Sequence, residues 1–256
     1  MENFFQKDEY FKYLKKNFDL IQKNKIDYFC TRSDLKVFNY YLNKLNISKN
    51  KSLLECGCGL GRILNLIKKK FNNKNLDLYG IDVSKKAIEY AKNKLKKLKK
   101  NIYNLKVEEI SKLKTKFDII ICWGVFDLTK QEIALKQMIN NLNLNGEILI
   151  SGKNNNYQFN DTDAIEAEIA CRKKKIPNSF TDFDLLEKFI KLSGCKIKHK
   201  YFFVKRGDAS KNKFNLEKPA KFYEYILIVK KIKNIKRIKK LKICSKFSKT
   251  FRLYNV

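Results

Sequence analysis

The chain has 256 residues, of which 44% are hydrophobic and 13% aromatic, and its formal net charge is +31. This composition supplies a core for one sizeable α/β domain with additions and excludes global disorder. No apolar run approaches a membrane span, and the N-terminus MENFFQKDEY resembles no signal peptide, so we expect a cytoplasmic protein.

The cysteines and the charge limit the partners that the sequence predicts. Seven cysteines show no CxxC pair and no zinc-ligand spacing, which indicates reduced thiols and no metal site. Lysine supplies nearly all of the positive charge, while arginine, which bidentate phosphate recognition favours, is scarce. We attribute most of the charge to an A/T-biased genome, and a nucleic acid or another anionic partner is the alternative.

The first 50 residues are predicted to be helical, with apolar and aromatic residues at spacings of three and four. A second helix is expected near Ser33, a suitable N-cap for DLKVFNYYLNKL. The residues of this segment that can reach a substrate are Tyr10, Tyr13, Tyr28, Phe29 and Arg32.

The stretch SLLECGCGLGR, residues 52–62, predicts a strand, a glycine turn and the start of a helix. Glycine is expected where a backbone turns sharply and approaches a ligand, because a Cβ would collide there. Amides at the helix start would face that ligand. The spacing differs from the G-x-G-x-x-G of dinucleotide sites. Cys56 and Cys58 are interpreted as small packing residues.

The following segments predict further parallel strands with polar residues at their ends. LDLYGI ends at Asp82, whose carboxylate can accept hydrogen bonds from both hydroxyls of a ribose, and Ser84 can cap the next helix. FDIIIC is an apolar run typical of a central strand. Its exit, Trp123 to Asp127, is expected at the reaction edge of the sheet, because ligands bind outside the carboxyl ends of the strands.

The pattern E-x-G-x-G-x-G, together with Asp82 after the second strand, resembles the class I S-adenosylmethionine-dependent methyltransferases over about residues 53–230. The resemblance implies an α/β fold: a three-layer Rossmann-like sandwich with a seven-stranded, mostly parallel sheet. CKIKHKYFFV and FYEYILIVKK would close that sheet, with the second strand inserted antiparallel near the C-terminus. The implied cofactor is S-adenosylmethionine and its product S-adenosylhomocysteine.

The resemblance also implies site residues. Val83 would pack on the adenine, and Glu108 is carried over for the adenine amino group because Lys106 stands where the family usually has Asp. Asp127 is the catalytic candidate, as general base for a hydroxyl acceptor. The cofactor-binding candidates are Glu55, Gly57, Cys58, Gly59, Gly61, Arg62, Asp82, Val83, Glu108, Cys122 and Trp123, and the substrate-binding candidates are Tyr13, Tyr28, Arg32, Tyr157 and Arg172.

The C-terminal half contains a turn, an insertion and a tail. Asn145 and Gly146 are expected to supply left-handed positions in NLNLNG, and Thr181 to cap the last helix, which ends at Gly194. Residues 153–180 are predicted to be a substrate-binding insertion. The only histidine, His199, is expected to face solvent. From Ile232 onward, apolar residues three apart among lysines predict a basic amphipathic helix.

Three parts follow: a helical segment 1–50, a methyltransferase core 51–231 and a basic tail 232–256. The first is an active-site cap or a packing appendage, and the last contacts a membrane surface, an acidic partner or its own domain.

The acceptor is interpreted as a small polar or anionic metabolite, such as a sugar or phosphate-containing precursor of a surface polysaccharide. Neither the Pro-Pro signature of amino-group base methylation nor a Pro-Cys nucleophile occurs in the sequence. An RNA methyltransferase is the alternative, and a cofactor-binding subunit without turnover is the third interpretation.

Overall fold

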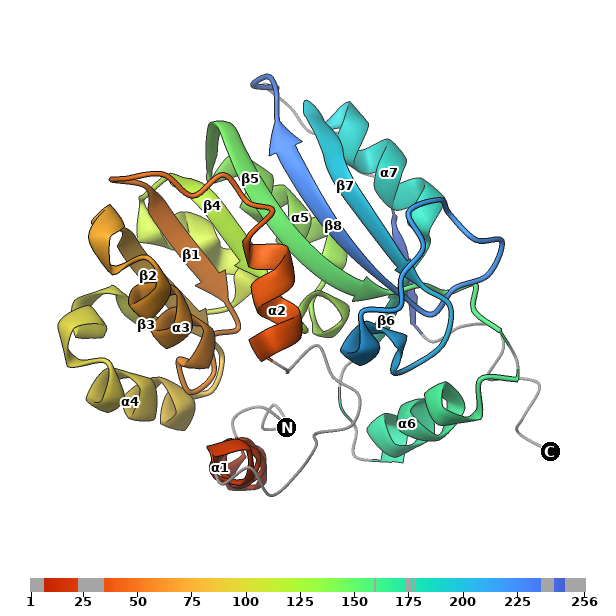
Figure 1. Cartoon of the computed structure of the whole chain (residues 1–256), viewed down its shortest axis with the longest axis horizontal. Coiled ribbons are helices and arrows are strands. Elements are labelled where there is room, and N and C mark those ends of the chain that lie inside the picture. The colour runs from red at the N-terminus through yellow and green to blue at the C-terminus, as the bar shows by residue number, and fades with distance from the viewer. Residues whose placement is uncertain are drawn as a thin grey trace.

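A seven-stranded sheet forms the centre of the protein (Figure 1). The computed structural model describes residues 7–22, 35–158, 160–173, 176, 178–235 and 242–246. The strand order is β3-β2-β1-β4-β5-β8-β7. The bounds are β1 Ser52–Cys56, β2 Asp77–Asp82, β3 Ile102–Asn104, β4 Phe117–Cys122, β5 Leu142–Lys153, β7 Cys195–Phe203 and β8 Glu224–Lys231.

The directions of the strands confirm the sequence prediction. Neighbours from β3 to β5 pair in parallel, whereas β8 pairs antiparallel with both β5 and β7. The parallel strands carry their carboxyl ends to one edge, the lower edge in Figure 1. Polar residues that follow different strands are therefore brought together at this edge.

Helices cover both faces of the sheet, which gives the three predicted layers. Alternate residues of β4 point to opposite faces: Ile119 and Ile121 pack with α2, α3 and α4, while Ile120 and Cys122 pack with α5 and α7. The bounds are α2 Leu35–Leu42, α3 Arg62–Lys70, α4 Lys85–Lys94, α5 Gln131–Asn140 and α7 Phe183–Leu192. Short 3₁₀ helices are η2 Asn72–Lys74, η3 Lys96–Asn101, η4 Val107–Leu113, η5 Phe126–Leu128 and η6 Asp208–Lys211.

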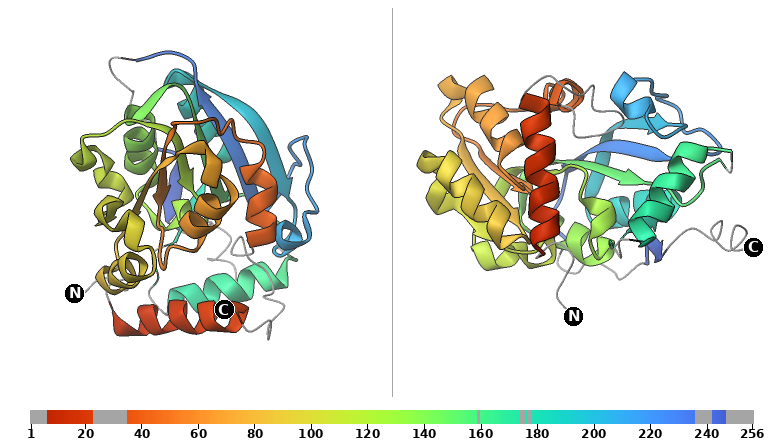
Figure 2. Two further views of the ribbon diagram at one scale, coloured as in Figure 1. Left: turned by 60° about the vertical axis from the view of Figure 1, so that its left-hand side comes forward. Right: turned by 90° about the horizontal axis from the view of Figure 1, so that it is seen from below.

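Two further helices, α1 Asp8–Gln22 and α6 Thr162–Lys173, lie beyond the carboxyl edge of the sheet (Figures 1 and 2). Helix α1 contacts α4, where the rings of Phe11 and Tyr90 meet edge to face with centroids 6.3 Å apart. Ser33, the predicted N-cap of α2, lies outside the described residues. Helix α2 itself is part of the core, since Phe38, Tyr41 and Leu42 are fully buried.

The tail prediction is wrong in the part of the tail that the structure describes. Residues 232–235 are not helical, and Cys244–Lys246 forms strand β9, which pairs antiparallel with β6, Ser179–Thr181. Ile243 is fully buried, and the Glu132 carboxylate accepts hydrogen bonds from the amides of Ile243 and Cys244 at 2.8 and 3.3 Å. The edge of β6 and the Glu132 carboxylate satisfy the extended backbone of residues 243–246, while residues 236–241, the middle of the predicted helix, lie outside the described residues.

Of the two residues predicted to take left-handed positions in the turn NLNLNG, only one does so. Asn145 is left-handed with φ 65°, as expected, but Gly146 is not; a Cβ there would lie 2.9 Å from the carbonyl oxygens of Asn143 and Asp118. Close packing rather than backbone conformation therefore requires glycine at position 146.

The predicted N-cap of α4 is confirmed, and that of α7 is wrong. Ser84 caps α4, as predicted. At α7 the cap is Asp182, which accepts from the Leu185 amide at 3.1 Å, while Thr181 belongs to β6. Gly194 follows α7 with φ 76°. The expectation that His199 faces solvent is only partly met, since its side chain is half-buried.

Candidate active site

The glycine turn after β1 is tied to the end of β2 by its own backbone. The amides of Gly57 and Cys58 both donate to the Ile81 carbonyl, at 2.7 and 2.9 Å. Gly57 has φ 73°, and a Cβ there would lie only 2.3 Å from Val125 Cγ2. This position therefore needs glycine for both its conformation and its packing.

Asp82 completes this connection from the β2 side. Its Oδ2 accepts the Gly59 amide at 2.9 Å, and its Oδ1 accepts the Ser84 amide at 2.8 Å. Burial raises the pKa of Asp82, and the two amides oppose the rise. Each carboxylate oxygen uses one lone pair for an amide and keeps another for a ligand.

Glu55 of β1 stabilises the turn by binding the start of the helix that follows it. It is 3% exposed, and its Oε2 accepts the Leu64 amide at 3.1 Å, in the first turn of α3. Burial raises the pKa of Glu55 well above its usual range, against the effect of this hydrogen bond. Glu55 thus holds the start of α3 against β1 and does not line the cavity described next.

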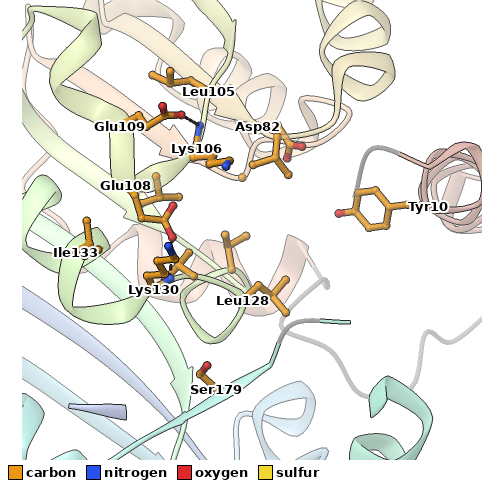
Figure 3. A pocket seen from close by; sticks show the side chains of 15 residues that line it. Tyr10, Asp82, Leu105, Lys106, Glu108, Glu109, Leu128, Lys130, Ile133 and Ser179 are labelled. Atoms are coloured by element: carbon orange, nitrogen blue, oxygen red, sulfur yellow. Dashed lines mark hydrogen bonds between the residues drawn. The ribbon is translucent and has the colours of Figure 1, made fainter. Parts of the chain in front are cut away.

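A cavity of about 550 Å³ opens beside Asp82 (Figure 3). This volume is typical of small-molecule sites, and the cavity lies at the carboxyl edge of the sheet, as expected for a ligand site of an open α/β fold. The lining residues are Tyr10, Gly57, Asp82, Val83, Leu105, Lys106, Val107, Glu108, Glu109, Val125, Leu128, Thr129, Lys130, Ile133 and Ser179.

The cavity has apolar walls and a carboxylate at the end away from Asp82. Val83, Val107 and Leu128 provide flat apolar surface. Glu108 accepts the Lys130 amide on Oε1 at 2.7 Å, where α5 begins, which leaves its Oε2 as an acceptor within the described part of the chain. Two acceptor groups separated by apolar walls suit a nucleoside, with its sugar at one end and its base at the other.

Some of the predicted cofactor residues meet at this cavity and others do not. Gly57, Asp82, Val83 and Glu108 line it. Cys58, Gly59, Gly61 and Arg62 form the turn and the start of α3, next to it. Cys122 is fully buried between strands.

Trp123, another cofactor candidate, is placed in the hydrophobic core. It is 7% exposed, and its ring packs against Phe38 and Tyr41 with centroids 5.2 and 5.7 Å away. It is not among the lining residues of the cavity.

Asp127, the catalytic candidate, belongs to a buried charged cluster at the ends of β4 and β5. Its Oδ2 lies 3.4 Å from Lys153 Nζ, and Lys153 also donates to Glu168 of α6 at 2.8 Å. Glu168 accepts further hydrogen bonds from the Tyr223 hydroxyl at 2.7 Å and from Asn178. Asp127, Lys153 and Glu168 are 3%, 7% and 0% exposed. The cluster fixes the insertion helix to the sheet, and Asp127 is not among the lining residues of the cavity.

The predicted substrate residues are scattered. Tyr157 is 2% exposed and stacks on Phe180 with centroids 5.6 Å apart, so it packs the insertion. Tyr13 is 54% exposed on α1, and Arg172 is exposed on α6. Tyr28 and Arg32 lie outside the described residues.

Sequence reasoning missed several residues of this region. Leu128, Thr129, Lys130, Ile133 and Ser179 line the cavity, and Lys153 and Glu168 form the buried ion pair. The first four lie in the connection from β4 through η5 to the start of α5, so the rule that ligands sit at strand ends was a usable signal for this segment. No sequence signal pointed to Lys153, because a lysine at a strand end is usually solvated.

The residues present fit S-adenosylmethionine. A Cβ at Gly59 would meet nothing within 4 Å, so open space lies beside the amide that holds Asp82. The Asp82 carboxylate could accept hydrogen bonds from ribose hydroxyls, Val83 and Leu128 could pack against an adenine, and Glu108 could accept a hydrogen bond from its exocyclic amine; all four residues line the cavity. Within the described ranges, no group of three or more His, Cys, Asp or Glu side chains is arranged to hold a metal ion.

Comparisons with known proteins identify the family. The chain belongs to the methyltransferase domain family, whose model matches residues 47–203. It is an S-adenosylmethionine-dependent methyltransferase. A comparison with curated proteins gave no match. In the described part of the chain, no helix is long and apolar enough to cross a membrane.

Solved structures share the fold at low identity. The plantazolicin methyltransferase BamL, solved with a triazolic desmethylPZN analogue and SAH, is 21% identical with a TM-score of 0.57; the match covers 87% of this chain and 91% of BamL. The MccD protein is 17% identical with a TM-score of 0.56, covering 77% and 96%. The [4+2]-cyclase SpnF is 11% identical with a TM-score of 0.54, covering 77% and 80%. At these identities the likeness concerns the fold alone.

Proposed function

We propose that this methyltransferase acts on an oxygen atom of a small polar or anionic metabolite, such as a sugar or a phosphate-containing precursor of a surface polysaccharide. The observation that carries the proposal is the position of α1 and α6, which both lie over the carboxyl edge of the sheet (Figure 2). Tyr10 of α1 reaches the cavity, and Glu168 ties α6 to β5. Two covers of this kind favour an enclosed site, which suits a small acceptor better than a polymer.

In the proposed chemistry the main task of the protein is to position the cofactor and the acceptor. When bound, the cofactor would supply a methyl group activated on a sulfonium, which would pass to the acceptor oxygen while S-adenosylhomocysteine leaves. Asp127 is proposed as the base that takes the proton of a hydroxyl acceptor. Lys153, 3.4 Å away, favours the ionised carboxylate that this role requires. An acceptor oxygen that is already anionic needs no base, and cationic side chains would then bind it.

Formation of S-adenosylhomocysteine tests the acceptor class. The enzyme is incubated with S-adenosylmethionine and with sugar nucleotides, sugar phosphates or total RNA, and product is measured at low and high salt. We expect turnover with a small-molecule pool and little salt dependence. The net charge of +31 motivates the RNA arm. Turnover with RNA alone, falling steeply with salt as phosphate contacts are lost, would refute the proposal.

The variant Asp127→Asn tests the assigned base. It keeps the shape of the side chain and one acceptor oxygen, but neither its negative charge nor its basicity. We expect it to bind S-adenosylhomocysteine as the wild type does and to lose most turnover with a hydroxyl acceptor. Unchanged turnover would remove Asp127 from the proposed mechanism.

The proposal places the enzyme in the cytoplasm. Strand β9 of the basic segment 232–256 packs on its own domain, and the lysines of that segment are proposed to meet an anionic surface such as the inner face of a membrane. Co-flotation with vesicles that contain anionic lipid tests this part. Binding should disappear with neutral vesicles, and equal recovery in both would contradict an electrostatic contact.

A further inference from the structure

Tyr10 is far in sequence from the glycine turn but lies over it. It lines the cavity together with Gly57 and Asp82. Figure 3 shows its side chain extending from α1 across the cavity mouth toward Asp82. The ring therefore faces the end of the cavity that is placed for the ribose.

Helix α1 is held there by contacts with the cofactor-binding elements themselves. Phe11 and Leu14, one helical turn apart, pack against a small apolar cluster of Leu60 and Ala87. Leu60 belongs to the glycine turn and Ala87 to the first turn of α4, which follows Asp82. An ion pair between Asp8 and Lys86 adds a second contact with α4. The docking surface of α1 thus belongs to the same two elements, the glycine turn and the start of α4, that flank the cofactor cavity.

The surroundings of Tyr10 keep its hydroxyl a hydrogen-bond donor. Burial raises the pKa of the Tyr10 hydroxyl, and the nearby Asp82 carboxylate raises it further. The side chain therefore presents a neutral phenol, with an apolar ring and one O–H, at the ribose end of the cavity. A ligand seated on Asp82 would be covered by this ring on its outer side.

We propose that Tyr10 is a cofactor-binding residue and that α1 is the cover of the cofactor cavity, docked more firmly when cofactor is bound. The apolar area of the ligand that the Tyr10 ring buries contributes to affinity. The bound ligand in turn gives α1 additional contact area, which stabilises its docked position. The proposal rests on the S-adenosylmethionine dependence of the enzyme and not on the identity of the acceptor. It concerns binding before any methyl transfer.

Calorimetric titration with S-adenosylhomocysteine tests the proposal on the full chain. Tyr10→Ala should raise the Kd about tenfold or more, because loss of a buried ring commonly costs over 1.4 kcal/mol. Tyr10→Phe separates the hydroxyl from the ring. Tyr13→Ala is the matched control: Tyr13 lies on the same helix but is 54% exposed and outside the cavity lining. We expect it to bind within about twofold of the wild type.

Hydrogen exchange supplies a second readout, in which each protein is compared with itself with and without ligand. S-adenosylhomocysteine should slow exchange of the α1 amides in the wild type and in Tyr13→Ala, and much less in Tyr10→Ala. Wild-type affinity of Tyr10→Ala, or α1 exchange that the ligand leaves unchanged in the wild type, would overturn the proposal. If the wild type failed to bind S-adenosylhomocysteine at all, the cofactor itself would be in question, so the two failures are distinguishable.

Discussion

Replacing Lys153 by Met should destabilise the protein strongly, because the lysine is the central cation of a buried cluster. Its Nζ lies 2.8 Å from Glu168 Oε1 and 3.4 Å from Asp127 Oδ2, and those two residues are 0% and 3% exposed. Methionine fills a similar volume between the rings of Phe180 and Tyr223, which flank the ammonium at 5.9 and 6.0 Å. The loss is therefore mainly one of charge compensation.

The magnitude follows from the burial. Removing one partner of a buried ion pair costs about 3–5 kcal/mol, since the remaining carboxylates stay desolvated. For a protein of this size, that corresponds to a fall in the melting temperature of roughly 6–20 °C. Glu168→Gln is the matched control. It leaves Lys153 with Asp127 and still accepts the Tyr223 hydroxyl, so its cost should be about 1 kcal/mol.

The pH dependence has a defined sign. In Lys153→Met, an uncompensated buried carboxylate has a folded-state pKa above its unfolded value, so it binds a proton more tightly when folded. The stability of the variant relative to the wild type should therefore fall as the pH rises from the unfolded-state pKa to the folded-state pKa of that carboxylate. Urea unfolding at pH 5.5 and 8 measures the effect. A Lys153→Met protein as stable as the wild type at pH 8 would refute the assignment of a compensated ion cluster.

Two further predictions concern the cofactor cavity. Burial raises the pKa of Asp82 above the ordinary 3.8, so affinity for S-adenosylhomocysteine should fall as the pH is lowered through the raised value, where the carboxylate protonates and accepts fewer hydrogen bonds. Asp82→Asn should bind about tenfold to a hundredfold more weakly. Its titration curves should be flat over the same pH range, and a wild-type pH profile in this variant would assign the titration to another group. Gly57→Ala should lose about 2–4 kcal/mol of stability, because a Cβ would meet Val125 at 2.3 Å and φ is 73°. A Cβ at Gly59 meets nothing, so Gly59→Ala should lose only about 1 kcal/mol of stability, yet it should weaken cofactor binding. Urea unfolding paired with ligand titration distinguishes the two variants. Equal losses of stability would contradict the packing described.

The sequence predicted the parts of the fold that local patterns encode. Apolar runs located the strands, the glycine spacing located the turn, and a carboxylate after LDLYGI located Asp82. These features depend on residues close together in the chain, so their physical reasons can be stated without the fold. Ser84 as a cap is a further example.

The parts that were missed depend on residues distant in sequence. Strand β9 exists because β6 offers it an edge and Glu132 accepts hydrogen bonds from the amides of Ile243 and Cys244, and no local sequence pattern indicates either contact. Trp123 follows a strand, as a ligand contact would, but α2 covers it with Phe38 and Tyr41. Lys153 is buried by residues distant in sequence, Glu168 of the insertion and the rings of Phe180 and Tyr223.

A crystal structure with S-adenosylhomocysteine tests the central claim, that the cavity beside Asp82 holds the cofactor, most directly. We predict ribose hydroxyls within hydrogen-bond distance of the Asp82 carboxylate and an adenine between Val83 and Leu128, with Tyr10 over the ligand. A ligand bound at another place, or a cavity without ligand at saturating concentration, would contradict the account.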